Sequence, residues 1–208
     1  MKKQDREFLS ENMSIDVDWI EQEFNSPDLV VSKQVFESYI SSLIFATSNN
    51  NPKKTILEKF KSVTPLDEKT ENYEILDSLR HIFTSFVTGG LFDLYVYQSN
   101  ESWYPKIVLK SELKPNDIAS LSDSINIYRG CNTSEFDSNI YGQSWSTSKQ
   151  VATEFAYQHY ASQPWYEKDK RCILKATIKK ENIFFSRQNH YEKEIAVNIE
   201  KLVHVQKT

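Results

Sequence analysis

The first residue that could do chemistry in this chain is an arginine at the end of an apolar run. Arg129 follows Ile125-Asn126-Ile127-Tyr128, and Gly130 comes directly after it. A strand seldom carries a guanidinium on its apolar face unless an anion neutralises it. Because Gly130 has no side chain, the backbone beside Arg129 could approach a ligand closely. The pair is therefore a candidate anion-binding element, with a salt-bridged structural arginine as the alternative.

A cluster of hydroxyl side chains follows Gly142. The segment reads Ser144-Trp145-Ser146-Thr147-Ser148 and leads into a predicted helix. Ser148 is placed to cap that helix. Ser144, Ser146 and Thr147 remain as hydrogen-bonding groups for a site, or as ordinary surface polarity.

Two carboxylates precede an apolar segment near the end of the chain. In an extended strand Glu192 and Glu194 would share one face, about 7 Å apart, and Lys193 would point the other way. Carboxylates of this kind suit the cleavage of glycosidic bonds, where they stabilise an oxocarbenium ion and orient a nucleophile. Surface charge is the alternative interpretation.

Glycine and cysteine counts exclude several common sites. The chain has four glycines, where average composition gives about fifteen. Their placement at Gly89-Gly90, Gly130 and Gly142 excludes a Walker loop and a dinucleotide fingerprint, which both need several glycines at short spacing. Cys131 and Cys172 are the only cysteines, so a four-cysteine zinc cluster is excluded. We expect no metal site.

The elements that would position these residues fall into two groups. Up to residue 100 the pattern is helical, with apolar stripes over 35–47 and 75–87. Ser26-Pro27-Asp28 predicts the start of the first helix, and Gly89-Gly90 predicts the end of the second. After Gly90 one helix is predicted over 151–160. Strands are predicted over 91–98, 106–110, 125–130, 172–178, 192–199 and 202–206.

These patterns predict an α+β protein, with a helical N-terminal region over 1–120 packed on a core over 121–208. Residues 1–100 carry ten basic and sixteen acidic residues, whereas residues 101–208 carry fifteen and thirteen. Ordinary scatter is the favoured explanation of this difference, and an anionic ligand on the slightly basic second half is the alternative. No apolar stretch approaches a membrane span or a signal peptide, so we expect a cytoplasmic protein with no membrane partner.

Taken in order, the motifs resemble those of mono-ADP-ribosyltransferases of the arginine–serine–glutamate class. The likeness is greatest to the compact bacterial and phage-related, toxin-like group. Its motifs correspond here to Tyr128-Arg129-Gly130, to Ser146-Thr147-Ser148 and to Glu192-Lys193-Glu194, with the helix over 151–160 between the second and the third. The resemblance covers residues 125–206 and implies a core built on a split antiparallel β-sheet.

The resemblance further implies NAD as the substrate that is consumed. Arg129 would contact its phosphates, and Gly130 would offer backbone hydrogen bonds to the nicotinamide amide. Ser146 and Thr147 would brace the active-site turn, and Ser146 would also fix the final glutamate. Glu194 would hydrogen-bond the ribose and stabilise the developing oxocarbenium charge.

The acceptor side is also implied by the resemblance. Glu192 would position or activate a macromolecular acceptor, either a protein arginine or RNA, and the loop over 185–191 would touch it. The segment over 159–170, with Trp165 and Tyr166, would flank the nicotinamide. A toxin of a toxin–antitoxin or phage-defence system is the biological role implied, with an antitoxin as a further partner.

Two other function classes stay open from the residues. One is a catalytically silent domain of the same fold that binds a partner. The other is an unrelated α+β nuclease toxin that uses Glu192, Glu194 and His190. Release of nicotinamide from NAD would distinguish the leading hypothesis from both.

Overall fold

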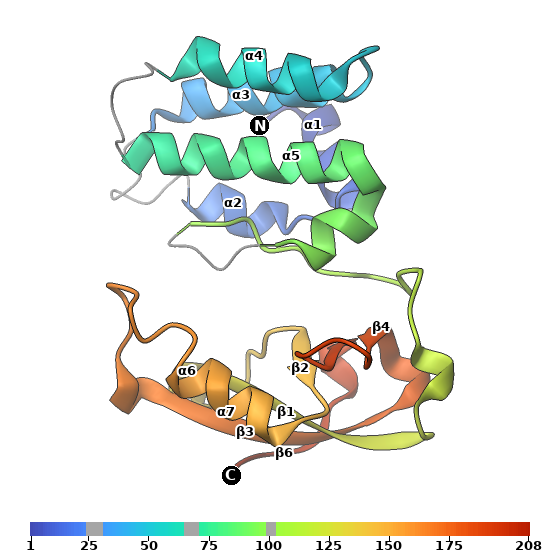
Figure 1. Cartoon of the computed structure of the whole chain (residues 1–208). Coiled ribbons are helices and arrows are strands. Elements are labelled where there is room, and N and C mark those ends of the chain that lie inside the picture. Colours follow the sequence, from blue (N-terminus) through green and yellow to red (C-terminus); the bar gives the residue numbers. More distant parts are fainter. Residues whose placement is uncertain (24–30, 65–70, 99–102) are drawn as a thin grey trace. The chain divides into compact units, whose positions relative to one another are not determined.

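The computed structural model describes residues 1–23, 31–64, 71–98 and 103–208 of the chain. They form two compact units, Met1–Val108 and Leu109–Thr208, which we call the N-terminal and the C-terminal unit (Figure 1). The sequence predicts a division near residue 120. Residues 109–120 instead belong to the C-terminal unit, where the N–H of Leu113 donates to the carbonyl of Phe184.

The N-terminal unit is helical, as its apolar spacing predicts. Its described helical elements are α1 Lys3–Glu7, the π-helical turn η1 Phe8–Asn12, α2 Val17–Glu23, α3 Lys33–Thr47, α4 Pro52–Val63 and α5 Glu71–Val96. Ser32 caps α3, because its hydroxyl accepts from the N–H of Val35. The helix start predicted at Ser26-Pro27-Asp28 lies outside the described residues.

Helix α5 is kinked at Gly89-Gly90. Gly90 has a φ of 66° and a ψ of −152°, a conformation that side chains disfavour, so the apolar stripe ends where the sequence predicts. The chain then resumes helical geometry up to Val96. The strand predicted over 91–98 is therefore wrong, because burial of Leu94 and Tyr95 within a helix outweighs their β propensity.

The strand predicted over 106–110 is also reduced. Ile107 pairs with Ile15 in a single antiparallel bridge, and this isolated pair is the only β structure within residues 106–110. The core of the N-terminal unit comes from helical side chains instead, and its fully buried members include Phe36, Leu43, Leu79 and Phe83.

The C-terminal unit is built on one antiparallel sheet. Its strands are β1 Ser124–Asn132, β2 Ser144–Ser146, β3 Arg171–Lys179, β4 Ile183–Arg187, β5 Glu194–Val197 and β6 Val203–Lys207. Their order across the sheet is β4-β5-β2-β1-β3-β6. The helices are α6 Thr133–Ser138 and α7 Lys149–Tyr157, with 3₁₀ turns η2 Ile118–Ser120, η3 Lys168–Lys170, η4 Lys180–Asn182 and η5 Ile199–Lys201. The α+β class is therefore confirmed.

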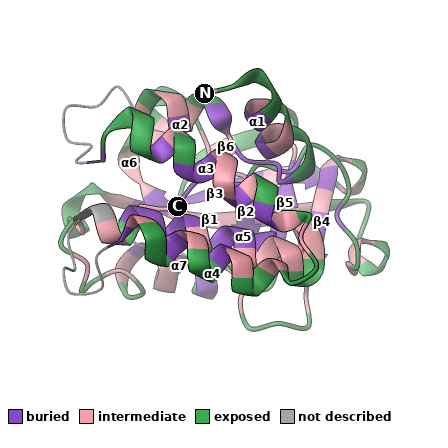
Figure 2. Ribbon diagram, turned by 90° about the horizontal axis from the view of Figure 1, so that it is seen from above, coloured by how far each residue is buried: buried purple, intermediate pink, exposed green. Residues whose placement is uncertain are grey.

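The two faces of this sheet are covered differently. One face holds the apolar core, whose members include Ile127, Trp145, Leu174, Ala176, Ile178, Ile183, Ile195 and Val197. On the opposite face α7 packs over β1 and β3, where Ala152 and Ala156 contact Ile173. Buried positions run along the strands, and exposed positions lie on the outer side of α7 (Figure 2).

The segment around the paired carboxylates differs from the prediction. Strand β5 starts at Glu194, and Lys193 before it has a φ of 45°. Because this left-handed residue interrupts the extended chain, Glu192 belongs to the preceding turn. The prediction that Glu192 and Glu194 share a strand face is wrong. The predicted recognition loop over 185–191 is a strand up to Arg187 and a turn thereafter.

Candidate active site

Four side chains form a row across the strands of the C-terminal unit. Tyr128 of β1 pairs with Ser146 of β2, Ser146 pairs with Glu194 of β5, and Glu194 pairs with Arg187 of β4. Residues directly opposite one another in antiparallel strands project from the same face. The sheet therefore places two hydroxyls, a carboxylate and a guanidinium side by side on the face that carries α7.

Glu194 is held by Ser144. The carboxylate residue is 8% exposed, and the Ser144 hydroxyl donates to its Oε1 at 2.8 Å. The two residues lie fifty positions apart in the chain, and the β2–β5 pairing brings them together. A hydrogen bond to a charged acceptor is short and strong, so this contact fixes the orientation of the carboxylate.

Arg129 lies one position away from the row and points to the other face. Its register partner on β3 is Leu174, a core residue, so its side chain starts from the core face. The guanidinium forms a bidentate pair with Glu135 of α6, at 2.8 and 2.9 Å. It also donates to the carbonyl of Ser144 at 2.7 Å. Three of its five N–H groups are thus engaged inside the protein.

Arg129 and Glu135 stabilise each other in their charged forms. Burial alone would raise the pKa of Glu135, but the charge and hydrogen bonds of Arg129 and the N–H of Gly142 hold it below its ordinary value. Burial alone would lower the pKa of Arg129, and Glu135 outweighs that effect, so this pKa is raised. Both groups remain charged at neutral pH. The sequence alternative of a salt-bridged arginine therefore describes what Arg129 does in the C-terminal unit.

Two glycines allow close contacts in this region, Gly130 with helix α7 and Gly142 with the side chain of Arg129. A Cβ on Gly130 would lie 2.1 Å from the carbonyl oxygen of Ala152 and 2.5 Å from the nitrogen of Ala156, so the bare backbone lets α7 approach β1. A Cβ on Gly142 would lie 2.2 Å from a terminal nitrogen of Arg129. Gly142 thus leaves room for the guanidinium.

Ser146 and Thr147 organise the turn before β5. The Ser146 hydroxyl donates to the carbonyl of Glu192 at 2.7 Å and accepts from the N–H of Ser148 at 3.0 Å. The Thr147 hydroxyl donates to the side-chain oxygen of Gln188 at 2.6 Å. These contacts fit the bracing role implied for both residues. The resemblance also implies that Ser146 fixes Glu194, but the hydroxyl that donates to the Glu194 carboxylate is that of Ser144.

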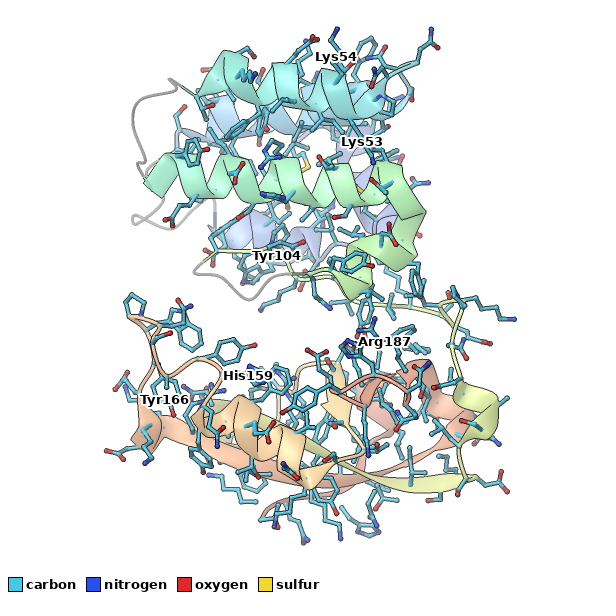
Figure 3. The ribbon with its side chains drawn as sticks, viewed as in Figure 1. Lys53, Lys54, Tyr104, His159, Tyr166 and Arg187 are labelled. Carbon is cyan, nitrogen blue, oxygen red and sulfur yellow. The ribbon has the colours of Figure 1, made fainter. Side chains whose placement is uncertain are left out.

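Aromatic side chains gather at the end of α7. The rings of Phe155 and His159 stack with centroids 4.4 Å apart, and those of Tyr160 and Trp165 lie 5.3 Å apart. The Tyr191 hydroxyl contacts the carboxylate of Glu154, which connects the turn before β5 to α7. Figure 3 shows His159 and Arg187 on the same side of the sheet of the C-terminal unit. The cluster can offer a ring face to a planar ligand.

Other reactive groups do not join this site. Cys131 and Cys172 are both buried, with sulfurs 3.9 Å apart, and burial raises the pKa of each thiol. Among the described residues, no group of three or more His, Cys, Asp or Glu side chains is arranged to hold a metal ion. His190 lies exposed in the turn before β5.

The structure adds three residues whose roles the sequence does not reveal: Ser144, Glu135 and Arg187. One sequence signal could have suggested Glu135. Asn132 is a residue type that caps helices, and here it accepts from the N–H of Ser134, so a helix starting at Thr133 would place Glu135 in its first turn, close to Arg129. Nothing in the residue pattern singles out Arg187, because its position opposite Glu194 depends on the register of β4 and β5.

Comparison with protein-family profiles, with curated proteins and with solved structures finds no match to this chain. Within the described part of the chain, none of the helices combines the length and the apolar character needed to cross a membrane.

Proposed function

We propose that the C-terminal unit is an NAD-dependent mono-ADP-ribosyltransferase. The observation that carries this proposal is the position of Ser144. Its hydroxyl orients Glu194 of β5, and its carbonyl accepts from Arg129 of β1. Ser144 of β2 thus contacts the arginine and the glutamate of the motifs at the same time. The order of the motifs in the sequence supports the same assignment.

Glu194 is the residue to which we assign the chemical step. As the bond between nicotinamide and ribose breaks, its electron pair leaves with nicotinamide and positive charge develops on the ribose ring. A fixed, largely buried carboxylate stabilises that charge without having to reorganise. The 8% exposure of Glu194 and its hydrogen bond from Ser144 meet this requirement.

The other motif residues then have supporting roles. Arg129 acts as a positioning residue, because it holds the backbone of Ser144. Glu192 lies in the turn before β5, half-buried, where it would accept the proton of the incoming acceptor. The acceptor is a macromolecule, a protein arginine or RNA, and a toxin role in a toxin–antitoxin or phage-defence system is part of the same proposal.

Transfer of labelled ADP-ribose tests the proposal. The full chain is incubated with adenylate-labelled NAD and a cell extract, and the product is treated with protease or with nuclease. Label that only protease releases indicates a protein acceptor, and label that only nuclease releases indicates nucleic acid. E194Q should abolish labelling, whereas E200Q, which removes an exposed carboxylate of the same unit, should not.

Two results would reject the proposal. If the intact chain transfers no label and releases no nicotinamide, it is a binding domain or an enzyme of another kind. If E194Q labels as well as the unchanged chain, the site lies elsewhere.

A further inference from the structure

Arg187 is the cation nearest in register to Glu194. It ends β4, and it pairs directly with Glu194 across the β4–β5 ladder. Side chains so paired have Cβ atoms about 5 Å apart on one face. The side chain of Arg187, labelled in Figure 3, therefore belongs to the row that contains Ser146 and Glu194.

The guanidinium of Arg187 is not used by the described structure. Its Nε is buried and has no hydrogen-bond partner among the described residues, and the guanidinium takes part in no ion pair there. A buried donor without an acceptor is costly, and native proteins rarely keep one unless a ligand or water completes it. An arginine fork suits a phosphate group best, because it can donate two parallel hydrogen bonds.

Two other arginines of the C-terminal unit are already engaged. Arg129 starts from the core face and is bound to Glu135. Arg171 donates to backbone carbonyls at the end of α7, those of Ala156 and Phe155. Neither is as well placed as Arg187 to meet an anion beside Glu194.

The backbone that presents Arg187 is held at the next residue, Gln188. Next to it, the N–H of Gln188 donates to Asp117 at 2.6 Å, and the Gln188 side chain bonds Thr147 at 2.6 Å and the carbonyl of Glu194 at 3.3 Å. Because this backbone is already ordered, binding of a ligand by Arg187 costs the rotamer entropy of its side chain but no further ordering of the main chain. Two carboxylates lie near this segment: Glu194 is the register partner of Arg187, and Asp117 accepts from the N–H of Gln188 and keeps one buried oxygen without a partner among the described residues.

We propose that Arg187 binds the diphosphate of NAD. This inference rests on the proposed transferase function and assigns the phosphate contact to Arg187 in place of Arg129. A diphosphate held by Arg187 would place the attached nicotinamide ribose next to Glu194, its register partner. Arg187 is then a substrate-binding residue whose contribution depends on the phosphates of the ligand.

Binding of ADP-ribose to the full chain tests this assignment by calorimetry, because this ligand carries the diphosphate and cannot release nicotinamide. R187Q should weaken ADP-ribose binding at least tenfold, and R187K should weaken it less. K179Q removes one exposed cation at the end of β3 and should change binding less than twofold. Failure of the unchanged chain to bind ADP-ribose, or equal binding by R187Q, overturns the assignment.

A second measurement separates phosphate binding from support of the neighbouring carboxylates. Nicotinamide release is compared for NAD and for nicotinamide riboside, which has no phosphate. R187Q should lower kcat/KM for NAD at least tenfold more than for nicotinamide riboside. An equal loss for both substrates means that Arg187 acts by holding the carboxylate of Glu194 or Asp117 in place and not by binding phosphate. This result overturns the proposal.

The same experiments distinguish a phosphate of NAD from a phosphate of an RNA acceptor at Arg187. They also separate failure of the phosphate assignment from failure of the proposed transferase function. Normal ADP-ribose binding by R187Q together with lost transfer to RNA would place a phosphate of the acceptor at Arg187, against the proposal. If ADP-ribose binding depends on Arg187 but no nicotinamide is ever released, the transferase function fails while the phosphate assignment holds.

Discussion

The hydroxyl of Ser144 donates to the carboxylate of Glu194 at 2.8 Å, although fifty residues separate them in the chain. Ser144 also accepts from Arg129 through its carbonyl. Ser144, a residue of the short strand β2, thus connects Arg129 to Glu194 through two hydrogen bonds. In the proposed reaction, this coupling is what keeps the carboxylate in place while charge develops on the ribose.

Loss of the Ser144 hydroxyl should therefore slow the reaction. S144A removes a hydrogen bond to a charged group, which is worth about 1.5–3 kcal/mol. We expect kcat for nicotinamide release to fall at least tenfold, with little change in ADP-ribose binding. S124A, which changes an exposed serine at the start of β1, should behave like the unchanged chain. Equal rates for S144A and S124A would show that this hydrogen bond does not act in catalysis.

The pair of Arg129 and Glu135 should matter for stability when only one partner is lost. R129Q leaves the Glu135 carboxylate partly buried beside the N–H of Gly142 without its cation. Breaking such a pair on one side costs about 3 kcal/mol, whereas replacing both partners is far less costly. In urea unfolding, R129Q should be strongly destabilised and R129Q/E135Q should recover most of the loss. A double variant as unstable as R129Q would contradict this interpretation.

The pH dependence of stability follows from the pKa of Glu135. Burial alone would raise this pKa, but Arg129 holds it below the ordinary value of 4.5. The charged form is thus favoured by folding, and its stabilisation is fully present above pH 4.5. It is lost as the pH falls from there through the lower pKa of the folded state. The difference in unfolding free energy between the unchanged chain and E135Q should accordingly shrink on acidification. A difference that is constant or grows would contradict the assigned sign.

Gly130 should tolerate no side chain, for a packing reason. In G130A the new methyl group would lie 2.1 Å from the carbonyl oxygen of Ala152, so α7 has to move away from β1. Overpacking of this kind typically costs about 1–3 kcal/mol. Thermal unfolding should show a clear loss for G130A and almost none for Q150A, on the exposed side of α7. An unchanged midpoint for G130A would mean that α7 does not contact Gly130 closely.

Local patterns predict several elements of the C-terminal unit correctly. Ser148 caps α7 as expected, and the apolar alternation of 125–130 and 172–178 corresponds to β1 and β3. The Arg129 side chain also starts from the same face as Ile127, as that alternation predicts. These features depend on neighbours in sequence, which is why the residue pattern reveals them.

The remaining differences depend on contacts between distant segments or on single backbone torsions. The left-handed Lys193 removes Glu192 from β5, and a lysine gives no signal of this backbone conformation. Ion pairing of Arg129 with Glu135 and the register of Arg187 opposite Glu194 arise only when strands and helices assemble. The sequence could therefore nominate the carboxylate and the hydroxyl segment, but not which serine or which arginine meets Glu194.

The most direct test of the central claim is the rate at which the purified full chain releases nicotinamide from NAD, compared with E194Q. We predict measurable release by the unchanged chain and a loss of about a hundredfold or more in E194Q, since stabilisation of transition-state charge by one group is worth about 3–4 kcal/mol. Circular dichroism should show both proteins equally folded. Equal release by E194Q, or no release by the unchanged chain, would contradict the assignment of Glu194 as the catalytic carboxylate.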